Sequence, residues 1–135
     1  MNWISNLVRP KIRNFLARRD VPAHLSALEE HGVPPVDVVV VNLYPFEDRV
    51  AKGVPFDEAL EYVDIGGPTL LRAAAKNFRH VAVVVDPADY ALLLEQLDRP
   101  GGIDAATRLY LSQKAFRHTA RYEAAIAGYF AQVEA

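Results

Sequence analysis

Residues 37–90 read DVVVVNLYPFEDRVAKGVPFDEALEYVDIGGPTLLRAAAKNFRHVAVVVDPADY, and this stretch decides the fold of the 135-residue chain. Apolar runs rich in valine lie near its two ends, at 36–41 and 81–85. Such continuous runs are typical of strands that are covered on both faces of a parallel sheet. Between them lie a glycine- and proline-containing turn at 64–69 and a helical pattern that continues to Lys76. We therefore predict two parallel strands that are connected through helices.

Further helices are predicted on both sides of these strands. Proline near a helix start, glycine after a helix end and apolar residues at helical spacing set their approximate limits. The predicted helices cover 3–19 (with a break at Pro10), 22–31, 56–63, 68–76, 86–97 and 104–132. Two parallel strands make a poor independent sheet. The predicted fold class is therefore α/β, with a partial parallel sheet that is flanked by helices and completed within a larger unit or by a partner.

Composition excludes several kinds of protein. The net charge is −2, which argues against a general nucleic-acid binder, because such proteins neutralise phosphates with excess cations. The chain has no cysteine, so disulfides and thiolate chemistry are excluded, and its four histidines share no metal-ligand spacing. No apolar run reaches the roughly 18 residues of a membrane span. We expect a cytoplasmic protein with no metal and no membrane association.

The turn at 64–69 is the first candidate site. Gly66 and Gly67 let a ligand approach the backbone, and the helix that follows offers unpaired N–H groups to an anion or a developing oxyanion. Asp64 can accept hydrogen bonds from an amide, and Thr69 lies in the first turn. Lys76 lies further along the helix and could move a proton if its ammonium is partly desolvated. The same pattern also fits a structural turn that is followed by a surface lysine.

A second candidate region follows the first strand. Ligands of parallel sheets bind beyond the carboxyl ends of the strands, where Asn42 and Tyr44 occur in Asn-Leu-Tyr-Pro-Phe. Asn42 could supply hydrogen bonds to a ligand. Tyr44 could contact a ligand ring, although a packed aromatic residue before a proline turn fits the pattern as well.

Four strings of the chain resemble a known family. They are NLYPF at 42–46, DIGGPTLLRAAAKN at 64–77, VAVVVDPADY at 81–90 and KAFRHTARYEAAI at 114–126. In this order they resemble the cyclohydrolase domain of the bifunctional proteins that combine phosphoribosylaminoimidazolecarboxamide formyltransferase with IMP cyclohydrolase. The resemblance implies the C-terminal part of a methylglyoxal-synthase-like domain. Residues 1–135 would form a single truncated domain, with a divergent N-terminal helix at 1–19 and a family-like part at 20–135.

The resemblance also implies a reaction. The family closes a formamido-imidazole-carboxamide ribonucleotide to inosine monophosphate and releases water. Asp64 matches the family's functional aspartate and would orient the carboxamide, whereas Lys76 matches its lysine and would stabilise or protonate the formyl oxygen. Tyr44 would help to position the ring and transfer a proton; Asn42, Gly66, Gly67 and Thr69 would bind substrate. The resemblance implies no cofactor, a purine-precursor ribonucleotide or IMP as ligand, and a homodimer.

The chain departs from the family pattern near its start. The family's phosphate-binding loops and its formyltransferase domain have no counterpart here, and Asn6 and Leu7 stand where the family has a catalytic Lys-Thr pair. Residues 1–16 instead resemble the opening of the acetyl-CoA carboxylase carboxyltransferase β subunit, which carries no functional implication without that subunit's cysteines. The activity would therefore be impaired. Two alternatives stay open: a non-catalytic remnant or interaction module, and a basic amphipathic N-terminus that anchors the chain at a membrane surface.

Overall fold

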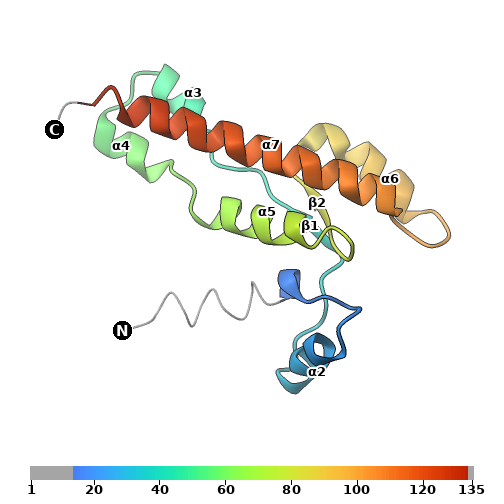
Figure 1. The fold of residues 1–135 in the computed structure, drawn as a ribbon. Helices are drawn as coiled ribbons and strands as arrows, with labels where there is room; N and C mark the ends of the chain where they lie inside the picture. Colours follow the sequence, from blue (N-terminus) through green and yellow to red (C-terminus); the bar gives the residue numbers. More distant parts are fainter. Residues whose placement is uncertain (1–13, 134–135) are drawn as a thin grey trace.

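The computed structural model describes residues 14–133, and its helices flank a small sheet (Figure 1). Helix α7 runs along the whole body, with α3 and α4 near its carboxyl end and α5 and the sheet along its middle (Figure 1). Helix α2 lies apart from this body, beyond the sheet (Figure 1). The elements in chain order are α2 (Pro22–Glu30), β1 (Val38–Val40), α3 (Phe46–Ala51), α4 (Phe56–Glu61), α5 (Gly66–Lys76), β2 (Ala82–Val84), the short 3-10 helix η1 (Pro87–Asp89), α6 (Tyr90–Leu97) and α7 (Ala105–Phe130).

The sheet of the described residues consists of β1 and β2, which are parallel, with Val39 opposite Val83. Backbone bonds continue the ladder at both ends, from Ala82 N to Asp37 O (2.8 Å) and from Val41 N to Val84 O (3.0 Å). Because parallel strands need a long crossover, α3, α4 and α5 all lie between them in sequence. The predicted α/β class, with a partial parallel sheet flanked by helices, is confirmed.

The two faces of the sheet pack against different helices, because successive side chains of a strand point to opposite sides. Val83 faces a core cluster with Leu71 of α5. Val84 faces a second cluster with Leu93 of α6 and Leu111 of α7. Strand β2 is therefore buried throughout. The prediction that both strands are covered on both faces is wrong for β1, because Val40 is 46% exposed on the side that α6 and α7 leave open.

A third cluster fixes the segment that follows β1. Phe46 at the start of α3 is almost completely buried and meets the edge of the Tyr122 ring, with 6.4 Å between the ring centroids. Ala59 of α4 completes the buried part of this cluster. The contact packs α3 and α4 against α7, just before the loop that leads from α4 to α5.

Several element limits differ from the predictions. Helix α5 begins at Gly66 rather than Pro68, and α4 ends at Glu61. Helix α3 was not predicted, because Phe46–Ala51 is too short to show helical periodicity. Asp86 caps the next helical segment, since its carboxylate accepts a hydrogen bond from Ala88 N. The helix predicted at 3–19 falls mostly outside the described residues, as do the resemblance of residues 1–16 and the proposed membrane anchor; the described part is helical at 14–16.

No helix within residues 14–133 combines the length and the apolar character that crossing a membrane requires.

Candidate functional site

Two side-chain hydrogen bonds fix the entry to α5. Asp64 Oδ1 accepts a hydrogen bond from Gly67 N at 2.7 Å, so this carboxylate satisfies one of the N–H groups that a helix start leaves free. The Thr69 hydroxyl donates to Ile65 O at 2.9 Å. Thr69 thus closes the first turn of α5. Because the Thr69 hydroxyl proton is used within the helix, this group is less suited to donate a hydrogen bond to a substrate.

Gly67 is where the two predicted regions meet. A Cβ atom at this position would lie 2.5 Å from Leu43 Cδ2 and would also clash with the Asp64 carboxylate. Glycine is therefore required by space and not by an unusual φ angle. The string around Leu43, which follows β1, and the string around Asp64 are consequently in contact.

Two exposed apolar side chains adjoin this contact in the sequence. Tyr44, which follows Leu43, is 56% exposed, and Ile65, which follows Asp64, is 76% exposed. An exposed aliphatic side chain beside a carboxylate and a helix start can contact a ligand ring. Ile65 was not predicted from the sequence, because an isoleucine before a glycine pair carries no chemical signal of its own.

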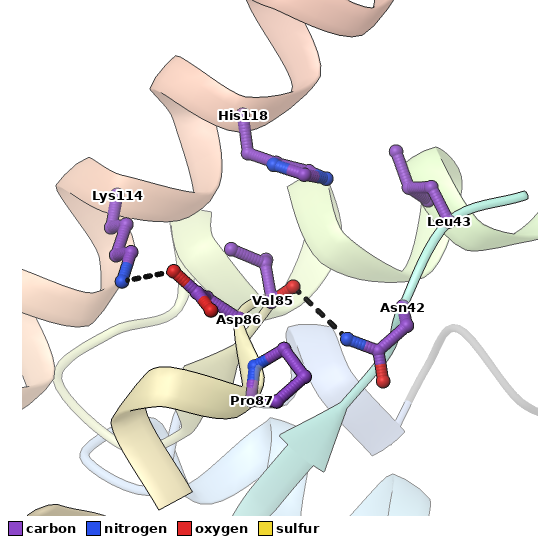
Figure 2. A pocket seen from close by; sticks show the side chains of 7 residues that line it. All are labelled: Asn42, Leu43, Val85, Asp86, Pro87, Lys114 and His118. Atoms are coloured by element: carbon purple, nitrogen blue, oxygen red, sulfur yellow. Dashed lines mark hydrogen bonds and ion pairs between the residues drawn. The ribbon is translucent and has the colours of Figure 1, made fainter. Parts of the chain in front are cut away.

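The side chain of Asn42 stabilises the sheet. Its Nδ2 donates to Val85 O at 3.2 Å, which joins the carboxyl ends of the two strands (Figure 2). Its Oδ1 accepts a hydrogen bond from the Tyr90 hydroxyl at 3.1 Å. Both ends of the Asn42 amide are therefore occupied by the protein. This arrangement explains why Asn follows the strand without requiring a ligand.

A pocket with an accessible volume of about 290 Å³ lies beside Asn42, between the strand ends and α7 (Figure 2). The ammonium group of Lys114, which lines this pocket, is already paired. Its Nζ lies 2.7 Å from a carboxylate oxygen of Asp86 and 2.7 Å from one of Asp89. Hydrogen bonds to these two carboxylates raise the pKa of Lys114, and the bond from Lys114 lowers the pKa of Asp86. The lining residues are Asn42, Leu43, Val85, Asp86, Pro87, Lys114 and His118.

The cluster of Lys114 with Asp86 and Asp89 was not predicted from the sequence. Asp86 and Asp89 could be seen in one matching string and Lys114 in another, but nothing in their spacing predicted that the strings would meet. The cluster ties α7 to the segment that follows β2. It is a structural ion pair at the margin of the pocket and does not offer a positive charge to a phosphate.

Lys76 lies far from Asp64. It occupies the last turn of α5, whose 11 residues put its Cα about 15 Å from that of Gly66 at 1.5 Å per residue. Its side chain is exposed. The structure thus brings Asp64, Gly67 and the segment of Tyr44 together, and it does not bring Lys76 to them within one copy of the chain.

Among the described residues, no group of three or more His, Cys, Asp or Glu side chains is arranged to hold a metal ion.

The fold and this helix entry define a class: an α/β protein with a carboxylate and a glycine-lined helix start beyond its strand ends. Comparison with known proteins specifies the class further. The family model described as AICARFT/IMPCHase bienzyme matches residues 74–135. The chain is also similar to the protein named bifunctional purine biosynthesis protein PurH in two bacteria.

The PurH protein of Thermoanaerobacter sp. (strain X514) is 47% identical over 127 residues, which are 93% of this chain and 25% of that protein. The PurH protein of Parvibaculum lavamentivorans is 49% identical over 125 residues, which are 92% of this chain and 23% of that protein. The chain therefore spans about a quarter of the length of these curated relatives.

A solved structure shows the same fold. The chain is similar to the structure titled "Crystal structure of ForH", with a TM-score of 0.77 and 36% sequence identity over 93% of this chain and 65% of that chain. The resemblance to the bifunctional purine biosynthesis proteins is confirmed, and the chain is PurH-like.

Proposed function

We propose that the chain acts in purine nucleotide biosynthesis through a cyclohydrolase-type site at the entry to α5. The observation that carries this proposal is the contact of Leu43, Asp64 and Gly67, which joins the two matching strings beyond the strand ends. The reaction would close a formamido-imidazole-carboxamide ribonucleotide to inosine monophosphate. In that step the carboxamide nitrogen bonds to the formyl carbon, and the formyl oxygen leaves as water.

Each residue of the site would have a separate role in this reaction. Asp64 would accept a hydrogen bond from the carboxamide N–H through a carboxylate oxygen that Gly67 N leaves free. The positive end of α5 would stabilise negative charge that develops on the formyl oxygen. Tyr44 is exposed beside this contact and would lie against the ring and transfer a proton. Asn42 would act indirectly, by holding the two strand ends together.

Lys76 requires a separate assignment. Because it lies at the opposite end of α5, it does not act on the atom that Asp64 holds within one copy of the chain. We therefore assign the centre of the site to Asp64, Gly67 and Tyr44. The proton-donor role expected for Lys76 would need a second copy or a different geometry, so its substitution discriminates between these arrangements.

A second candidate function is ligand binding without turnover. It is favoured by the state of Lys114, whose ammonium is neutralised by two carboxylates and so is not available to a substrate phosphate in the neighbouring pocket. The same chain would then keep the helix entry as a binding site for the base of a nucleotide.

Calorimetric titration with inosine monophosphate, together with a cyclohydrolase assay, tests both functions. We expect micromolar affinity for the unaltered chain. Asp64→Asn keeps an acceptor for Gly67 N but removes the charge, which should weaken binding by about 1.5–3 kcal/mol, or roughly ten- to a hundredfold. Lys76→Ala should cost much less, and Lys52→Ala, at the exposed end of α3, should change nothing.

The outcomes separate the candidates. Binding without turnover favours the second function. No binding at millimolar inosine monophosphate, with the chain shown to be folded, would refute both. An equal loss in the Asp64 and Lys76 variants would show that Lys76 reaches the same ligand atoms, contrary to our assignment.

A further inference from the structure

The hydroxyl of Tyr122 joins α7 to the loop that carries Asp64. It donates a hydrogen bond to Tyr62 O at 2.9 Å and accepts one from Asp64 N at 2.8 Å. A single side-chain oxygen thus satisfies two backbone groups on either side of Val63. These bonds span the loop that connects α4, which ends at Glu61, to α5, which begins at Gly66.

The Tyr122 ring is itself held in place. It is 6% exposed and belongs to the buried cluster with Phe46 and Ala59. Its position inside the 26-residue helix α7, more than two turns from the last residue Phe130, fixes its backbone. Burial raises the pKa of the Tyr122 hydroxyl, so it stays protonated at neutral pH and keeps its role as a donor to Tyr62 O.

Asp64 is therefore anchored twice, from two different helices. Its backbone N–H is bound by Tyr122 of α7, and its carboxylate Oδ1 is bound by Gly67 N of α5. The first bond sets where the Cα of Asp64 lies, and the second sets the direction of its carboxylate. Removal of the first would leave Asp64 N and Tyr62 O without these partners in a partly buried loop, which favours a rearrangement.

We infer that Tyr122 is a positioning residue, which holds the Asp64 carboxylate at the α5 entry in the orientation that receives an amide N–H of the ligand. The part of this inference that concerns the ligand rests on the proposed function. The part that concerns the carboxylate depends on the geometry of the chain alone.

The test uses Tyr122→Phe, which removes the hydroxyl and keeps the ring, with Tyr129→Phe as its matched control. Tyr129 lies on the same helix and packs on Phe46, with ring centroids 5.6 Å apart. Amide hydrogen exchange is followed by NMR in the unaltered chain and both variants. The amide of Ala82, which is bonded to Asp37 O in the sheet, reports global stability.

In Tyr122→Phe we expect the amides of Asp64 and Gly67 to exchange at least about tenfold faster relative to Ala82. The Gly67 amide is the decisive readout, since its hydrogen-bond partner is the Asp64 carboxylate and not Tyr122. Tyr129→Phe should leave both amides unchanged. An unchanged Gly67 amide in Tyr122→Phe would overturn the inference.

Titration with inosine monophosphate provides the second arm. We expect affinity to fall about three- to tenfold in Tyr122→Phe and to stay unchanged in Tyr129→Phe. Faster Gly67 exchange with unchanged affinity would overturn the role at the ligand. If the unaltered chain does not bind inosine monophosphate, the proposed function fails, and the exchange data still decide whether Tyr122 positions Asp64.

Discussion

The two adjacent glycines of α5 have different surroundings. A Cβ atom on Gly67 would clash with Leu43 and with the Asp64 carboxylate, whereas a Cβ atom on Gly66 would meet nothing within 4 Å. We predict that Gly67→Ala displaces Asp64 and destabilises the fold by about 1–3 kcal/mol, the usual range for overpacking. Gly66→Ala should be neutral or stabilising by up to about 1 kcal/mol, because alanine is the better helix former.

Thermal melts and titrations with inosine monophosphate on both variants check this prediction. Ligand affinity should fall in Gly67→Ala and be kept in Gly66→Ala. Equal behaviour of the two variants would show that the Leu43–Gly67 contact does not shape the site.

The adjacent leucines Leu70 and Leu71 of α5 differ in burial. Leu71 is the fully buried residue and belongs to the cluster that contains Val83, while Leu70 is only half-buried. We predict that Leu71→Ala lowers the free energy of unfolding by about 2–5 kcal/mol, the range for a large-to-small change in a core. Leu70→Ala should cost clearly less; urea unfolding of both variants provides the measurement, and the reverse order would contradict the packing described above.

Some residues of the candidate site could be proposed from the sequence, and others could not. Asp64, Gly67 and Tyr44 lie in local motifs beyond strand ends, so they could be recognised from spacing and resemblance. The hydroxyl of Tyr122 could not, because its partner Asp64 N lies 58 residues away in the sequence. The engagement of Asn42 by Val85 and Tyr90 likewise depends on how the strands pair.

At the scale of elements, Lys114 connects α7 to the segment after β2 through Asp86 and Asp89. The pKa of Asp86 is lowered, chiefly by the hydrogen bond from Lys114. Stability from a lowered carboxyl pKa is present above the unfolded value of about 3.9 and is lost as the pH falls through the folded value. The pKa of Lys114 is raised, so its contribution is lost only at alkaline pH, above its unfolded value of about 10.4.

We therefore predict that Lys114→Met destabilises the chain at pH 7, because it leaves the buried Asp89 carboxylate without its partner. The difference in unfolding free energy from the unaltered chain should shrink between pH 5 and about pH 2. Urea unfolding at several pH values measures it, with Lys52→Met as the control. A difference that does not change with pH would show that the loss of packing, and not of charge pairing, causes the effect.

Longer elements were easier to predict than short ones. The 26 residues of α7 and the valine runs of both strands showed clear patterns, and their types were correct. Helix α3 spans six residues, and it is stabilised by the burial of Phe46 against α7 rather than by a local helical signal. Such an element depends on tertiary contacts that the sequence order does not reveal.

At the scale of the whole molecule, the two strands of the sheet differ. Strand β2 is buried throughout, whereas β1 has a partly exposed outer edge. Val39 pairs with β2, so the alternation of a parallel ladder directs the N–H and C=O groups of Val38 and Val40 away from it. Within residues 14–133, no further strand pairs with β1 on that side. Open edges of this kind pair readily with a second chain unless a charge or a bulge prevents it.

We propose that the chain self-associates through this edge of β1 and predict that Val40→Lys disrupts the association. Val40 is 46% exposed, and a lysine on an edge strand opposes pairing because its charge would have to be desolvated between two strands. Leu94→Lys is the control, since it places the same charge at an exposed leucine that belongs to α6 and not to the strand. Sedimentation at tens of micromolar should show a dimer for the unaltered chain and for Leu94→Lys, and a monomer for Val40→Lys. A folded monomer for the unaltered chain would refute the proposal, and dissociation in both variants would locate the interface elsewhere.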